Sequence, residues 1–232
     1  IAKKKEEGIE PFKSFNELQL WWPSHAAGFT VYLTQIGFFS PLVLIFYKLF
    51  SGFAVYNWLT FINFILGGLG MYWLSRNLKI SKITSVICGL AYIFSQNNLY
   101  WGATLIFSNA YPFIPFFFLV LLKISQNSGW IWWVFGSLVT TYGLVAAEIQ
   151  IVFFTFVIGF FWILFLFWQS KKPKPIWGYF SIGILGTILA SFWLLPVLNY
   201  LKFTTRSSAL SFENLVYDFM RIADPLRFFY PF

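Results

Sequence analysis

Charged residues are scarce in this sequence. They make up 10% of the 232 residues, whereas an ordinary soluble domain contains roughly a quarter. Apolar residues take their place, because 59% of the chain is hydrophobic. A run of about 20 apolar residues spans the hydrocarbon core of a membrane as a helix, and the chain contains several such runs without the alternation of barrel strands. The composition therefore excludes a water-soluble fold and predicts an all-α, polytopic transmembrane helical bundle.

Cysteine and histidine each occur once, as Cys88 and His25. A single cysteine forms no internal disulfide, and within an apolar run Cys88 is expected to pack as a small hydrophobic side chain. His25 has no cysteine or carboxylate close in sequence and is a poor metal site by itself. We identify no cofactor, because phosphate-binding glycine loops and paired-cysteine motifs are missing; a requirement for a divalent metal stays open.

The formal net charge of +8 would suit nucleic acid, but the basic residues lie in short loops beside apolar runs. This distribution is not that of a nucleic-acid-binding face. The lipid bilayer is the expected partner instead. Because the sequence starts at Ile1 and stops within an aromatic run, we expect it to be a fragment of a longer protein.

The apolar runs divide the chain into three parts. We expect an extracytoplasmic loop with short helices at 1–37, a transmembrane helical bundle at 38–200, and the start of a second extracytoplasmic loop at 201–232. The run Phe38–Phe50 is too short to span and predicts a re-entrant or interfacial helix. The six predicted spans are Phe53–Leu74, Ile83–Phe94, Ala103–Leu122, Trp130–Ala147, Ile149–Trp168 and Ile176–Leu195.

Glycine and proline modify two of these spans. Gly67, Gly68 and Gly70 leave a smooth face on the first span, where a neighbouring helix is expected to approach closely. Pro112 and Pro115 are expected to bend the third span.

The basic loops predict the orientation of the bundle. If six spans alternate, the loops at Arg76–Lys82, Lys123 and Lys171–Lys174 fall on one side with seven Lys or Arg and no acid. The positive-inside rule makes that side cytoplasmic, in a multi-pass protein of the bacterial inner membrane. Glu148 and the tail from Lys202 then lie outside. The basic cluster Lys3–Lys5 runs against this orientation.

Glu148 is the only acidic residue between Glu17 and Glu213. A carboxylate among apolar residues requires water, a cation or a proton near the bilayer. One interpretation is a solvated outer turn between two helices. The other places Glu148 with Gln150 at the mouth of an outward cavity, as a binding group or general base.

Arg206 lies among hydroxyl side chains just beyond the last predicted span. A guanidinium there can clamp a phosphate at the membrane surface, or contact ordinary lipid headgroups.

Several motifs, in order, resemble the YfhO-like bacterial membrane proteins of the GT-C class of glycosyltransferases. The first-loop pattern is similar at Leu18–Pro23, then at Gly28, and again at Gln35–Leu42, where Ser40 replaces the usual Tyr. Further similar stretches are Gly67–Leu74, Gly89–Ser95 and the tail from Leu195 through Ser211. The resemblance covers most of the chain from Leu18 onward.

This resemblance implies transfer of a sugar from a polyprenyl-phosphate-linked donor to a cell-envelope glycan or lipid acceptor on the outer membrane face. It implies that Arg206 binds the carrier phosphate, and that Gln150, His25 and Gln35 surround the outward cavity with Glu148. Trp21 and Trp22 are predicted to stack on a sugar or to anchor the loop at the interface.

Two departures from the family pattern concern catalysis. The family commonly has G-H-x-Q where this chain has Ala147–Gln150, so that Glu148 stands in place of a histidine. The catalytic aspartate of GT-C enzymes is expected upstream of Ile1. A transporter or flippase for a lipid-linked or polar substrate, and a non-catalytic membrane scaffold, stay as alternatives.

Overall fold

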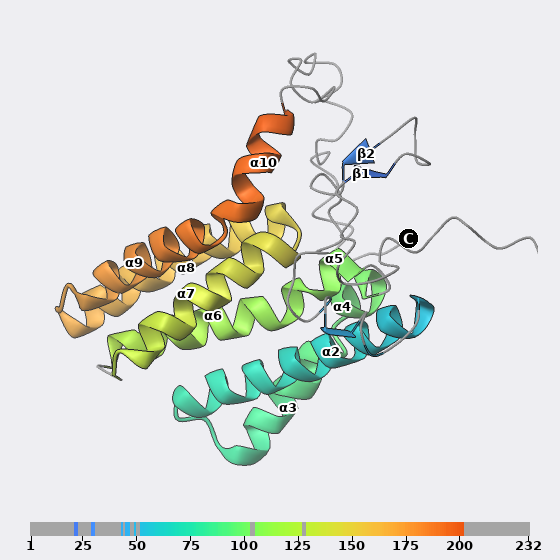
Figure 1. Cartoon of the computed structure of the whole chain (residues 1–232). Coiled ribbons are helices and arrows are strands. Elements are labelled where there is room, and N and C mark those ends of the chain that lie inside the picture. Colours follow the sequence, from blue (N-terminus) through green and yellow to red (C-terminus); the bar gives the residue numbers. More distant parts are fainter. Residues whose placement is uncertain are drawn as a thin grey trace, which may run out of the picture. The chain divides into compact units, whose positions relative to one another are not determined.

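The computed structural model describes residues 21–22, 29–30, 43, 45–46, 49, 52–102, 105–126 and 129–201. Figure 1 labels the strands and helices. Their bounds are β1 Trp21–Trp22, β2 Phe29–Thr30, α2 Gly52–Asn77, α3 Lys82–Ile93, α4 Gln96–Trp101, α5 Leu105–Ser108, α6 Ala110–Ser125, α7 Ile131–Ala146, α8 Ile149–Ser170, α9 Lys174–Leu189 and α10 Ser191–Leu201.

The chain divides into two compact units, Ile1–Leu195 and Pro196–Phe232. The first contains both strands and all of the helices up to the first half of α10. The described part of the second is the remainder of α10, Pro196–Leu201. The helical bundle described below belongs to the first unit.

The four described residues of the segment 1–37 form an antiparallel strand pair. Trp21 pairs with Thr30, and Trp22 pairs with Phe29. The short helices predicted for this segment lie outside the described residues.

The prediction of a helical membrane bundle is confirmed, but its six spans are not. In the described part of the chain, two helices are long and apolar enough to cross a membrane, at Ala54–Asn77 and Ile149–Gln169. A third is obtained if α9 and α10, which are bent by 70° relative to each other, count as one broken span. The apolar helices α3, α6 and α7 have 12, 16 and 16 residues, and at 1.5 Å per residue even 16 residues cover only about 24 Å of a core of about 30 Å.

Helix α6 forms the centre of the core. It contacts α2, α7, α8 and α9, and its Phe113, Phe117, Val120 and Leu121 are almost completely buried. Helix α8 instead exposes most of its apolar surface, since only 28% of its spanning window is buried. Because lipid tails are as apolar as these side chains, such a surface is stable in a bilayer.

The predicted close approach at the glycines of α2 is confirmed. A Cβ on Gly68 would meet Ile93 of α3 at 2.3 Å, and a Cβ on Gly70 would meet Pro115 of α6 at 3.0 Å. On the facing helix, a Cβ on Gly89 would lie 2.9 Å from the backbone oxygen of Gly68. Small residues therefore bring the α2 and α3 backbones together, as at many membrane helix interfaces.

The third predicted span is interrupted at Asn109, between α5 and α6. Proline removes one backbone donor and its ring clashes with the carbonyl four residues earlier. For Pro112 that carbonyl belongs to Ser108, next to the interruption. For Pro115 it belongs to Tyr111, whose oxygen instead accepts a hydrogen bond of 2.9 Å from the Tyr92 hydroxyl of α3.

We expect Tyr92→Phe to lower the free energy of unfolding by about 1–3 kcal/mol, because the buried Tyr111 carbonyl loses its donor. Thermal unfolding of the purified protein in mixed micelles would measure this change. Tyr72→Phe, which removes a hydroxyl on α2, is the control. Equal melting temperatures for Tyr92→Phe and the parent would show that this bond contributes nothing.

The three basic turns lie at one end of the helical unit. Figure 1 shows the turns α2–α3, α6–α7 and α8–α9 toward the left, while the α7–α8 junction lies at the other end. At the turns, the Lys123 ammonium sits 5.6 Å from the Trp132 ring centroid and that of Lys171 sits 5.7 Å from the Trp168 ring centroid. Lysine beside tryptophan is typical of a membrane–water interface.

Candidate functional site

A buried polar cluster links three helical segments near the end opposite the basic turns. The Asn63 side chain of α2 donates to the Asn109 side-chain oxygen at 2.7 Å and to the Ser108 hydroxyl at 3.4 Å. The Tyr142 hydroxyl of α7 donates to the Asn63 and Asn109 oxygens at 3.4 and 3.5 Å. Asn63 and Asn109 are each only 1% exposed, so their carboxamides depend on these partners.

The cluster also reaches the α7–α8 junction. The Asn109 amide donates to the Ala146 carbonyl at 2.9 Å. Ala146 is the last residue of α7, and its carbonyl is one of the groups that a helix end leaves without an intrahelical donor. Asn109 therefore caps the carboxyl end of α7.

Glu148 lies directly after this capped end. Its side chain is 8% exposed, and it occupies the N-cap position of α8 with extended backbone angles of φ −62° and ψ 125°. A carboxylate is favoured there by the positive end of the helix dipole. The interpretation of a fully solvated turn does not fit this burial, whereas a carboxylate enclosed at a helix junction does.

Gln150 does not share this environment. It lies in the first turn of α8 and is exposed. Residues two apart on a helix point to different faces. Glu148 therefore follows the helix end that Asn109 caps, whereas Gln150 is exposed.

The remaining predicted site residues stay untested by the geometry. His25, Gln35 and Arg206 lie outside the described residues. Trp21 and Trp22 form β1 and pair with β2 through the backbone, and this pairing does not test the predicted role of their side chains. Across the described ranges, no group of three or more His, Cys, Asp or Glu is arranged to hold a metal ion.

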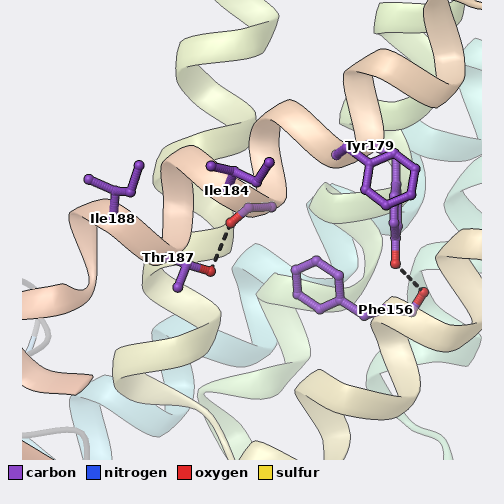
Figure 2. Close-up of a pocket in the computed structure, with 7 residues that line it drawn as sticks. Phe156, Tyr179, Ile184, Thr187 and Ile188 are labelled. Atoms are coloured by element: carbon purple, nitrogen blue, oxygen red, sulfur yellow. Dashed lines mark hydrogen bonds between the residues drawn. The ribbon is translucent and has the colours of Figure 1, made fainter. Parts of the chain in front are cut away.

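A separate pocket of about 420 Å³ lies between α8 and α9. Figure 2 labels Phe156 from α8 and Tyr179, Ile184, Thr187 and Ile188 from α9 among the residues that line it. Its two hydroxyls are engaged with backbone carbonyls: Tyr179 donates to Phe156 at 2.9 Å and Thr187 donates to Gly183 at 2.8 Å. An apolar lining with engaged hydroxyls fits hydrocarbon rather than a sugar.

Sequence reasoning missed the asparagine cluster. The available signal was Asn63 itself, a carboxamide in the middle of a predicted span, since polar residues inside membranes usually face the bundle interior. Its partners could not be inferred, because Ser108, Asn109 and Tyr142 lie 45, 46 and 79 residues further along the chain.

These observations define an integral-membrane helical protein with a buried polar cluster at one end. Residues 37–232 match the family described as "6-pyruvoyl-tetrahydropterin synthase related domain; membrane protein". Since the match covers most of the chain, the protein belongs to this family. No curated protein and no solved structure matches the chain.

Proposed function

We propose that this chain is part of a YfhO-like membrane glycosyltransferase of the GT-C class. It would move a sugar from a polyprenyl-phosphate-linked donor to a cell-envelope acceptor on the outer membrane face. The ordered sequence motifs support the proposal, and membership of a membrane protein family supports its location in the bilayer. The observation that carries it is Glu148, 8% exposed at the α7–α8 junction. This junction lies at the end of the helical unit away from the basic turns (Figure 1).

The proposal includes six membrane passes with the basic turns in the cytoplasm of a bacterial cell. Helices α3, α6 and α7 would then cross as short passes, with α5 extending α6 and the α9–α10 pair forming one broken pass. The common location of the three basic turns in Figure 1 supports this arrangement, because the positive-inside rule places such turns in the cytoplasm.

In the proposed reaction, the bond between the anomeric carbon of the sugar and the donor phosphate oxygen breaks. A bond forms between the anomeric carbon and an acceptor hydroxyl oxygen, and Glu148 takes the hydroxyl proton as general base. Polyprenyl phosphate is the leaving group, and Arg206 would bind its phosphate. Gln150, His25, Gln35, Trp21 and Trp22 are proposed to contact the sugar or acceptor.

The proposal predicts that Glu148→Gln lowers sugar transfer about 100-fold, within the range found for loss of a general base. Membranes containing the full-length protein would receive radiolabelled polyprenyl-phosphate hexoses, and label in the acceptor fraction would be counted. Asn77→Ala is the control, because Asn77 lies near a basic turn and, within the described residues, its side chain donates to the Trp73 carbonyl at 2.8 Å. Transfer by Glu148→Gln at the parent rate would remove Glu148 from the mechanism.

Transport of a lipid-linked or polar substrate is the second candidate. Broken helices and buried carboxylates are features of transporters, and the described residues contain the bent α9–α10 pair and the buried Glu148. In that case substrate flux into sealed vesicles would depend on Glu148 without any sugar transfer. A scaffold would show neither activity.

A further inference from the structure

We infer that Asn109, braced by Asn63, positions Glu148 by fixing the carboxyl end of α7. What Glu148 does rests on the proposed function, but its placement is a matter of geometry and is testable separately.

Asn109 is connected to Glu148 through a short stretch of backbone. The Asn109 amide holds the Ala146 carbonyl at 2.9 Å, and only Ala147 separates that residue from Glu148. Ala147 has an extended backbone, with φ −98° and ψ 164°, and donates to the Gly143 carbonyl at 3.1 Å. A displacement of the Ala146 carbonyl therefore moves the backbone that carries Glu148.

Asn63 holds the Asn109 side chain in place. Its side-chain oxygen accepts the 2.7 Å hydrogen bond from Asn63, while its amide points to Ala146. With both ends of the carboxamide engaged, the group cannot rotate without breaking a buried bond. Such bonds are strengthened by the low dielectric of the interior. The α7–α8 junction is thereby tied to α2, a helix remote from it in sequence.

A matched asparagine separates positioning from general stability. Asn98 is also buried, at 5% exposed, and its amide also donates to a backbone carbonyl, that of Tyr92. This carbonyl belongs to the last turns of α3, which does not lead to Glu148. Loss of the Asn98 bond should loosen the protein without moving the α7–α8 junction.

The experiment reads the accessibility of position 148 in native membranes. Cys88→Ser with Glu148→Cys leaves position 148 as the one thiol of the given 232 residues, and its reaction rate with N-ethylmaleimide is measured by mass spectrometry of the peptide that carries it. We expect Asn109→Ala to raise this rate at least about fivefold, the factor that corresponds to one lost net hydrogen bond. Asn98→Ala should change it less than about twofold, since the Asn98 side chain bonds to α3 and not to α7.

Asn63→Ala keeps the test decisive if Asn109→Ala fails to insert. It leaves the Asn109 side chain in place and removes its brace, so the rate should rise in the same direction. Unchanged rates in both variants, or an equal rise with Asn98→Ala, would overturn the inference. If Glu148→Gln leaves transfer intact while Asn109→Ala exposes position 148, the proposed function fails and the positioning role stands. If Glu148→Gln abolishes transfer while Asn109→Ala leaves position 148 as protected as in the parent, the proposed function stands and the positioning role fails.

Discussion

We expect Gly186→Leu to destabilise the bundle by about 3 kcal/mol, at the upper end of overpacking effects. A Cβ at this position of α9 would lie 2.5 Å from the Thr140 Cβ and 3.0 Å from the Ser137 carbonyl oxygen of α7. Thr141 strengthens the same seam, since its hydroxyl lies 3.1 Å from the Gly186 carbonyl. Any larger side chain must push α7 and α9 apart, and this would be measured as a loss of unfolding free energy in mixed micelles.

Gly183→Leu provides the control on the same helix. A Cβ there would meet only the Phe156 ring, at an ordinary contact distance of 3.6 Å, at the edge of the α8–α9 pocket. Both variants gain the same helix propensity relative to glycine, so the comparison isolates the steric term. If the two variants melt at the same temperature, close packing at Gly186 does not stabilise the bundle.

The second large effect is expected for Asn63→Leu, which should destabilise the protein by about 3 kcal/mol. Leucine has a similar size, but the Asn109 oxygen loses its 2.7 Å bond and keeps only the 3.5 Å contact from the Tyr142 hydroxyl. Weakening the hydrogen bonding of a buried group costs up to about 3 kcal/mol. Chemical or thermal unfolding followed by tryptophan fluorescence would measure this loss.

Thr60→Val is the matched variant, one turn earlier on α2. The Thr60 hydroxyl is buried and makes no hydrogen bond within the described part of the chain. Replacement by the isosteric valine should therefore be neutral or slightly stabilising. A comparable loss in both variants would indicate that polarity on this face of α2 matters, and not the bonds of Asn63.

The α2–α3 packing and the α5–α6 interruption differ in how far the sequence predicted them. Gly67, Gly68 and Gly70 indicated a close helix contact, because absent side chains are visible in sequence. Pro112 and Pro115 indicated a bend, but the interruption lies upstream at Asn109. The reason is that proline acts on the carbonyl four residues before it.

The six predicted passes were not confirmed, because the length of an apolar run in the sequence does not fix the length of the helix that forms there. The sixth apolar run reads as continuous, yet α9 ends at Leu189 and α10 continues at an angle of 70°. The runs around α6 and α7 likewise become helices of 16 residues. Their ends are set by packing and by capping bonds such as that from Asn109 to Ala146.

The sequence by itself determined that this chain is a helical membrane protein, because scarce charge and long apolar runs leave no other stable state in water or lipid. It also identified Glu148, since an isolated carboxylate stands out among apolar neighbours. Only the tertiary structure decided that Glu148 is buried, and that a cluster of Asn63, Asn109 and Tyr142 caps the helix end two residues before it. Hydrogen-bond partners so far apart in sequence become neighbours only when the helices pack.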